Sequence, residues 1–181
     1  MKLDIYYLVS FLLPKLLDTN LISVYYYFMI QAHQINSVSK NNFLSLMKLY
    51  EKNYYLITNL INTEVINANN LNKDFQSSSI DLKKKLLLSI YSVSKHTALV
   101  KFSYNFFSKD TYINYVNLKI YFDSKQVEII DSNGFNKSKC LKDMQKFHNI
   151  RLSKWYKSYF LSLWLNNCIK NGYSFDAQSE V

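Results

Sequence analysis

The stretch from Val116 to Ile130, VNLKIYFDSKQVEII, carries the clearest structural pattern in this chain of 181 residues. Apolar and polar side chains alternate over Val116–Phe122 and again over Val127–Ile130, which is the period of a strand with one buried face. The turn-forming run Asp123-Ser124-Lys125-Gln126 separates them, so the sequence predicts a β-hairpin. Leu99–Phe107 alternates in the same way and predicts a third strand of an antiparallel meander.

Helical and strand patterns precede this meander. Residues 3–17 place apolar side chains near helical spacing, and Pro14 is expected to bend or end that helix because its ring removes a hydrogen bond. Val24–Ile30 (VYYYFMI) is β-branched and aromatic, so a buried strand is predicted there. A second helix is expected to start near Ser39 and to run to about Tyr54.

The segment Thr58–Thr97 differs from its surroundings, because it is rich in Asn, Ser and Lys. We interpret it as an insertion, with a helix predicted at Leu82–Tyr91. On the other side of the meander, Ser132–Lys142 is polar and is predicted to be a connector. A last helix is expected at Leu161–Lys170, capped by Asn171-Gly172.

The predicted order of elements defines an α+β class. An N-terminal helix-strand-helix-strand-strand block, residues 1–132, contains the long insertion at 58–97. A smaller basic α/β block, residues 133–181, follows it.

Composition limits the kinds of function. The chain has 17 % aromatic residues and a formal net charge of +9, which favours a polyanionic partner, either nucleic acid or an anionic membrane surface. Two glycines are too few for a glycine-loop nucleotide site. No apolar run reaches the roughly 18 residues of a spanning helix, so no membrane insertion is expected. Cys140 and Cys168 fit no metal or redox spacing and are expected to be thiols.

The positive charge is concentrated near Arg151, the only arginine beside 21 lysines. Residues 137–157 hold six Lys, Arg151 and one acid, Asp143, which gives a net charge of +6. A guanidinium fork grips phosphate, lysines neutralise phosphates, and aromatic rings stack on bases. The predicted RNA-binding residues of this segment are Arg151, Ser153, Lys154, Tyr156, Lys157, Lys137, Lys139, Lys142 and Lys146. The alternative is a solvated lysine face whose aromatic residues lie in the core.

Catalysis and metal binding have little support in the sequence. The three histidines, His33, His96 and His148, are far apart and none accompanies a pair of carboxylates. No Ser, Cys or Lys lies in a nucleophile motif, and no His/Cys/Asp set has ligand spacing. We therefore expect no enzyme activity, no metal, no cofactor and no small-molecule substrate.

Several ordered stretches resemble the bacterial-type small-subunit ribosomal protein eight family. Ser39–Ile57 resembles its second helix, Val116–Ile130 its hairpin, and Leu165–Gly172 a Leu-x-x-Val-Leu-x-Gly run. Arg151–Ser162 (RLSKWYKSYFLS) is similar to the family's Arg-Ile-Ser-Lys motif. Trp155-Tyr156 replace the family's Pro-Gly, Thr58–Thr97 has no counterpart there, and only Ser179 agrees with the family's RNA-reading Ser-Thr-Ser loop.

This resemblance implies a structural component of the small ribosomal subunit that binds the central domain of its rRNA and supports assembly. Its partners would be small-subunit rRNA and neighbouring ribosomal proteins, and Ser179 would join the RNA contacts. The lysine-rich, arginine-poor composition is typical of an A+T-rich gene, so a ribosome in the mitochondrial matrix is the expected location.

Two other classes remain open. An accessory, non-catalytic subunit of an inner-membrane respiratory complex shares the aromatic-rich, glycine-poor composition. A phage or plasmid nucleic-acid-binding protein from an A+T-rich host shares the basic segment.

Overall fold

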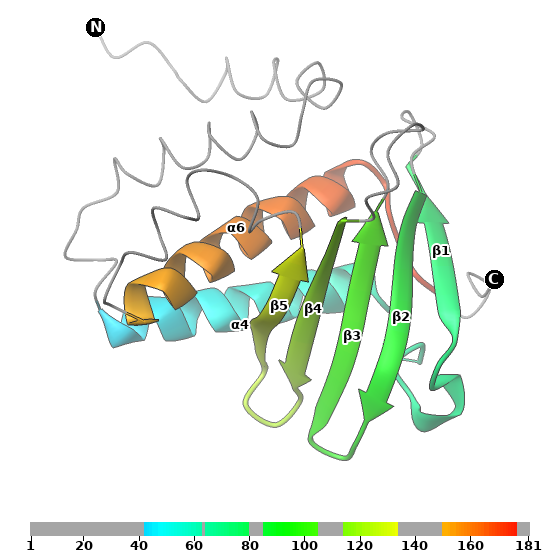
Figure 1. Cartoon of the computed structure of the whole chain (residues 1–181), viewed down its shortest axis with the longest axis horizontal. Helices are drawn as coiled ribbons and strands as arrows, with labels where there is room; N and C mark the ends of the chain where they lie inside the picture. The colour runs from blue at the N-terminus through cyan, green and yellow to red at the C-terminus, as the bar shows by residue number, and fades with distance from the viewer. Residues whose placement is uncertain (1–41, 63, 80–84, 105–113, 134–149, 177–181) are drawn as a thin grey trace, which may run out of the picture. The chain divides into compact units, whose positions relative to one another are not determined.

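The computed structural model describes residues 42–62, 64–79, 85–104, 114–133 and 150–176, which all belong to one compact unit, Lys40–Val181. Its centre is a five-stranded antiparallel sheet with the strand order β1-β2-β3-β4-β5 (Figure 1). The strands are β1 (Asp74–Ser78), β2 (Lys85–Val93), β3 (Thr97–Tyr104), β4 (Asn114–Tyr121) and β5 (Gln126–Asn133). Each strand pairs with the next one along the chain, so the sheet is a simple meander.

The hairpin at Val116–Ile130 forms because its alternation and its turn agree. Val116, Leu118 and Ile120 of β4 are buried at 1 % exposure or less, and Val127 pairs with Ile120 from the opposite strand. In the turn, the backbone N–H of Ser124 donates to Asp123 Oδ1 at 2.8 Å, and Lys125 takes a left-handed φ of 52°. This side-chain contact and the left-handed residue that follows it reverse the chain tightly.

Two helices, α4 (Phe43–Leu60) and α6 (Ile150–Lys170), cover one face of the sheet and run in the same direction (Figure 1). A short 3₁₀ helix, η1 (Ala68–Asn70), precedes β1. The Asn42 side chain caps α4 by accepting from Leu44 N at 2.9 Å. Gly172, at a φ of 76°, ends α6 in the left-handed conformation that glycine adopts without strain.

The core lies between the sheet and these two helices. Phe102 of β3 is fully buried, and its ring lies 5.4 Å from Trp164 of α6 and 5.9 Å from Phe175, centroid to centroid. Asn53 of α4 is also fully buried and donates from Nδ2 to the Ser158 carbonyl of α6 at 2.9 Å. The Trp155 indole donates to Ser45 Oγ at 3.1 Å and joins the beginnings of the two helices.

The predicted fold class is wrong in its order of elements. The described chain has a helix, then the five strands, then a helix, instead of a helix-strand-helix-strand-strand block followed by a smaller α/β block. The main error is the segment 58–97: β1 and β2 both lie entirely in the supposed insertion, and the helix predicted at Leu82–Tyr91 is largely strand β2. The predicted helix at residues 3–17 and the predicted strand Val24–Ile30 lie outside the described residues.

The physical reason is the burial pattern of β2. Leu86, Leu88 and Ile90 are buried at 3 % exposure or less, whereas Leu87 and Ser89 between them are partly exposed. This period of two belongs to a strand with one face on the core. The predicted helix Leu161–Lys170 lies within α6, which begins eleven residues earlier at Ile150.

Candidate nucleic-acid interface

The predicted basic segment enters the structure as the first turns of α6. Arg151 and Lys154 are exposed, and Ser153 and Lys157 are partly exposed. Tyr156 is only 6 % exposed, so its ring belongs to the core and has no open face for a base. Lys137, Lys139, Lys142, Lys146 and Ser179 lie outside the described residues, so their predicted RNA contacts stay predictions.

The aromatic side chains that follow Arg151 pack inside the protein. Trp155 is 4 % exposed and stacks on Tyr159 at 5.2 Å with an interplanar angle of 12°. Tyr156 meets Trp155 edge-on at 5.5 Å. Among the described residues of this segment, cations therefore reach the surface while the rings stabilise the helix pair.

Lys154 has a defined partner. Its Nζ lies 2.6 Å from Glu128 Oε1 of β5, and the same oxygen accepts from the Tyr50 hydroxyl of α4 at 3.3 Å. Burial raises the pKa of Tyr50 far above its ordinary value, and the nearby Glu128 carboxylate raises this pKa further. The cluster of Tyr50, Glu128 and Lys154 joins the two helices to the edge strand, so Lys154 has a structural role besides its charge.

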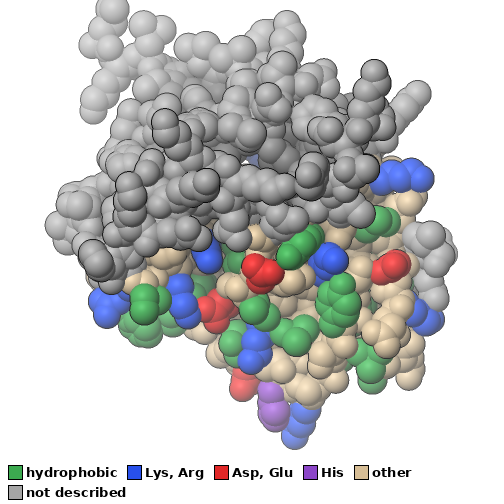
Figure 2. Space-filling model, in the orientation of Figure 1, with side chains coloured by type: hydrophobic (Ala, Val, Ile, Leu, Met, Phe, Trp, Pro, Cys, Tyr) green, Lys and Arg blue, Asp and Glu red, His purple; other side chains and the backbone are tan. Residues whose placement is uncertain are grey.

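A second surface combines basic and aromatic side chains: the face of the sheet that points away from the two helices. Its positions alternate with the buried core residues along each strand. We call it the open face, and we define it by Tyr91, Leu99, Lys101, Tyr115, Asn117, Lys119 and Tyr121 with their cross-strand neighbours. In Figure 2, hydrophobic side chains, a class that includes tyrosine there, lie beside both basic and acidic side chains over the described part of the molecule.

Lysines and tyrosines on this face contact each other directly. Lys101 Nζ lies 4.9 Å from the centroid of the Tyr115 ring and 6.0 Å from that of Tyr91. Lys119 Nζ lies 4.9 Å from the centroid of the Tyr121 ring. These are cation–π distances, and the rings belong to two different strands, β2 and β4, on either side of β3.

Two β-bulges flank Lys101. In β2, Ile90 pairs with Val100 and Ser92 pairs with Leu99, so Tyr91 is an extra residue, and it is 51 % exposed. In β5, Asp131 and Ile129 pair with the consecutive residues Asn117 and Leu118, so Ile130 is extra, and it is 52 % exposed. Bulges redirect side chains and occur often beside functional sites.

The charges of the open face are arranged by strand. The three central strands contain Lys85, Lys101 and Lys119 and no acidic residue. Within the strands, carboxylates stand only on the two edges, as Asp74 on β1 and as Asp131 and Glu128 on β5, and the Glu128 carboxylate is bound to the helices through Lys154 and Tyr50. The Tyr115 hydroxyl donates to Asp131 Oδ2 at 3.2 Å, and this hydrogen bond raises the pKa of Tyr115. The centre of the face therefore suits an anion with planar groups.

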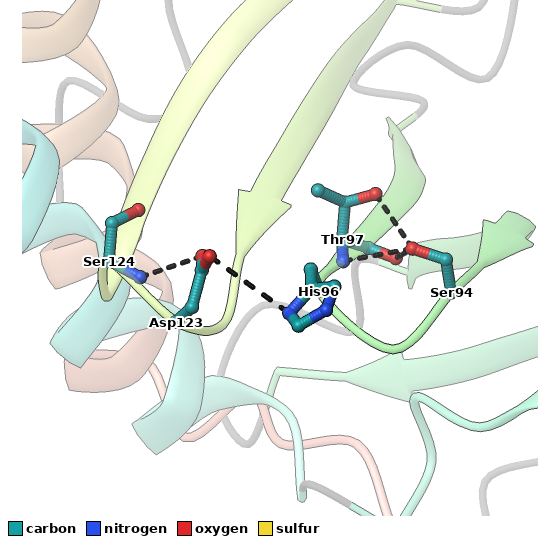
Figure 3. A network of polar contacts seen from close by, with 5 residues as sticks. All are labelled: Ser94, His96, Thr97, Asp123 and Ser124. Atoms are coloured by element: carbon teal, nitrogen blue, oxygen red, sulfur yellow. Dashed lines mark hydrogen bonds and ion pairs between the residues drawn. The ribbon is translucent and has the colours of Figure 1, made fainter.

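A polar network lies at one end of the sheet, where the β2–β3 and β4–β5 turns meet (Figure 3). His96 Nδ1 is 4.0 Å from Asp123 Oδ2, and both side chains are more than 60 % exposed. Ser94 Oγ lies 3.0 Å from Thr97 Oγ1 and accepts from the Thr97 backbone N–H at 3.1 Å. At that distance and exposure the His–Asp pair does not make an activated nucleophile, so we assign the network to the geometry of the turns.

Clusters of metal ligands and membrane-spanning helices are both absent from the described ranges. Within them, no three His, Cys, Asp or Glu side chains are grouped so that they could hold a metal ion. None of the described helices combines the length and the apolar character needed to cross a membrane.

The family of this chain follows from a family model, described as "Protein of unknown function (DUF1249)", that matches residues 63–174. This match covers more than half of the chain, so the chain belongs to that family. It contains all five strands and α6, so the open face and the start of α6 are part of the matched region. Comparisons with curated proteins and with solved structures found no match.

The family match corrects the predicted membership of the ribosomal protein eight family. The match begins at residue 63, so it also includes most of the supposed insertion. The resemblance rested on short motifs such as Arg151–Ser162, and in the structure this segment is the N-terminal half of α6, which packs on α4. The ribosomal function, the rRNA partner and the mitochondrial location depended on that resemblance, and they remain untested predictions.

Sequence reasoning missed the open face because it looked for cations and rings close together in sequence. The available signal was the polar face of each alternating strand: Lys101 on β3, and Tyr115, Lys119 and Tyr121 on β4. Reading alternate residues of the predicted strands would have placed Lys101, Lys119 and Tyr121 on one surface, and Tyr115, directly before the predicted strand Val116–Phe122, continues the same alternation. Tyr91 carried no such signal, because its position depends on the bulge in β2.

Proposed function

We propose that this chain is a non-catalytic protein that binds single-stranded nucleic acid on the open face of its sheet. The observation that carries the proposal is Lys101, held between the rings of Tyr91 and Tyr115 on three adjacent strands. Single-strand-binding surfaces combine stacking rings with cations that follow the backbone. Unpaired bases expose their faces to such rings, whereas a duplex hides them.

The simpler explanation is a solvated sheet face on which lysines cover tyrosines. Significant cation–π contacts occur about once per 70–80 residues. Three contacts at cation–π distance, two of them made by Lys101, fall on this one sheet, which has 38 residues in its strands. The central strands also lack carboxylates, whereas an ordinary solvated face mixes both signs of charge. Both observations favour a binding surface over a solvated face.

The net charge of +9 supports the proposal through a term that does not depend on sequence. Arg151 and Lys157, exposed or partly exposed at the start of α6, would add to the positive potential. We give them a steering role, because the aromatic residues of their segment are buried.

The test is fluorescence anisotropy of the purified full chain with labelled oligonucleotides of about 16 nucleotides, the upper end of typical single-strand sites. Unstructured RNA and DNA are compared with a duplex over about 50 to 200 mM salt. We expect binding of single strands that weakens with salt. The logarithm of the association constant should fall with the logarithm of the salt concentration, with a slope of about −0.7 for each phosphate contacted. Failure of the wild-type chain to bind any single strand would refute the proposed function.

A matched pair of variants locates the surface. Tyr115→Ala removes one stacking ring and should weaken binding by about 1–3 kcal/mol, or about 5- to 150-fold in Kd. Tyr55→Ala is the control, because Tyr55 is 57 % exposed on α4, on the other side of the sheet. Equal affinities of the two variants would exclude the open face even if the wild-type chain binds.

A further inference from the structure

We propose that Lys101 occupies, in the free protein, the place where a nucleobase stacks, and that it leaves this place when a strand binds. This inference rests on the proposed function and adds a step to it. The rings of Tyr91 and Tyr115 would then form a base-binding slot that the Lys101 ammonium fills in the free protein. When a strand binds, this ammonium would move from the rings to a phosphate.

Geometry is the first argument. The ammonium of Lys101 lies over the Tyr115 ring at 4.9 Å and over the Tyr91 ring at 6.0 Å. The two ring centres are therefore at most about 11 Å apart, the sum of these two distances. A base that stacks on either ring must take the position of the cation, because both approach the π face.

Energetics make the exchange feasible. A base stacked on an aromatic side chain stabilises a complex more than a cation–π contact at an exposed site does. The displaced ammonium can then neutralise a phosphate and release a counterion. Both new contacts favour the bound state, so the lysine is a weak occupant that a strand can replace.

An unsatisfied polar atom beside Lys101 is the second, independent argument. Asn117 is the direct cross-strand partner of Lys101, and its Oδ1 is buried without a hydrogen-bond partner in the described structure. A buried acceptor without a donor destabilises the free protein. Movement of the neighbouring Lys101 side chain would open this oxygen to a donor such as the exocyclic amino group of a base.

Tyr115 is held in place for this role. Its hydroxyl donates to Asp131 on β5, which fixes the ring while its face stays on the side of Lys101. Tyr91 stands on a bulge, so its ring reaches the slot from β2 without disturbing the core register. The mobile part of the slot is then the unbranched lysine side chain, and both walls belong to the sheet.

The experiment is nuclear magnetic resonance of the full chain with carbon-13 in its lysines. In the free protein, ring currents from Tyr91 and Tyr115 should shift the ε-methylene protons of Lys101 upfield. Lys125, exposed in the β4–β5 turn, supplies the reference, and loss of a signal in Lys101→Gln supplies the assignment. The ligand is an unstructured oligoadenylate of about eight nucleotides, within the usual range of single-strand sites.

Three outcomes are distinguishable. If the oligoadenylate binds and the Lys101 signal moves to the Lys125 position, the inference holds, and Lys101→Gln should lower the salt slope by about 0.7. If the oligoadenylate binds while Lys101 keeps its upfield shift, the inference is refuted and the proposed function stands. If neither this ligand nor any other single strand binds, both are refuted.

Discussion

Replacement of Phe102 by alanine is the most direct test of how the sheet meets α6. Phe102 is fully buried, and its ring contacts Trp164 at 5.4 Å and Phe175 at 5.9 Å. Removing a buried phenylalanine costs about 3–5 kcal/mol. Each aromatic contact adds about 0.5–1.5 kcal/mol beyond the area it buries, so we expect the upper half of that range. This is a large share of a typical stability of about 5–15 kcal/mol.

The assay is urea unfolding of the full chain, followed by tryptophan fluorescence. Both tryptophans of the chain, Trp155 and Trp164, lie on α6, so the signal reports the loss of this packing. The midpoint should fall while the m-value stays the same. Tyr91→Ala is the control, because the exposed Tyr91 side chain leaves no core cavity behind. A loss below about 1 kcal/mol for Phe102→Ala would refute the packing of β3 against α6.

Two further predictions concern the cluster that joins α4, β5 and α6. Burial and Glu128 raise the pKa of Tyr50 in the folded chain above its ordinary value of 10.0. The protonated Tyr50 hydroxyl therefore contributes to the stability of the fold at every pH below 10. That contribution is lost as the pH rises above this value, so Tyr50→Phe should lose less stability than wild type between pH 10 and pH 12, measured by urea unfolding. A double-mutant cycle of Glu128→Gln and Lys154→Met should give a small coupling of about 0.2–1 kcal/mol, because Lys154 is half-exposed. A coupling of zero would show that the 2.6 Å pair contributes nothing to stability in solution.

The strands with regular alternation could be predicted from sequence, and those that depend on a partner could not. Val116–Ile130 has both an alternating pattern and a turn, and it forms β4 and β5. Asp74–Ser78 (DFQSS) has one apolar residue, Phe75, so only its pairing with β2 makes it a strand. The Leu86-Leu87-Leu88 run favours a helix by intrinsic propensity, and burial of alternate side chains overrides it.

The beginning of α6 was hidden for an electrostatic reason. The first turn contains Arg151 and has no acidic residue, although the N-terminus of a helix favours negative charge. Local signals therefore placed the helix start at Leu161, and the basic segment before it resembled a binding loop. The packing of Trp155 and Tyr156 in the core outweighs the unfavourable charge, and this packing cannot be deduced from the segment alone.

The bulge at Tyr91 adds a side chain to the open face without being required for the pairing of β2 with β3. Ile90 pairs with Val100 and Ser92 with Leu99, so deleting Tyr91 would make two consecutive pairs and preserve the alternation of buried and exposed residues.

We expect this deletion to change the free energy of unfolding by less than about 1 kcal/mol, as for a surface change. It should weaken oligonucleotide binding by about 5- to 150-fold, as the loss of one stacking ring would. A deletion that unfolds the chain would mean that the bulge serves the fold, and normal binding by the deletion variant would remove Tyr91 from the interface. Because core register does not require this residue, its place beside Lys101 is best explained by the surface it helps to form.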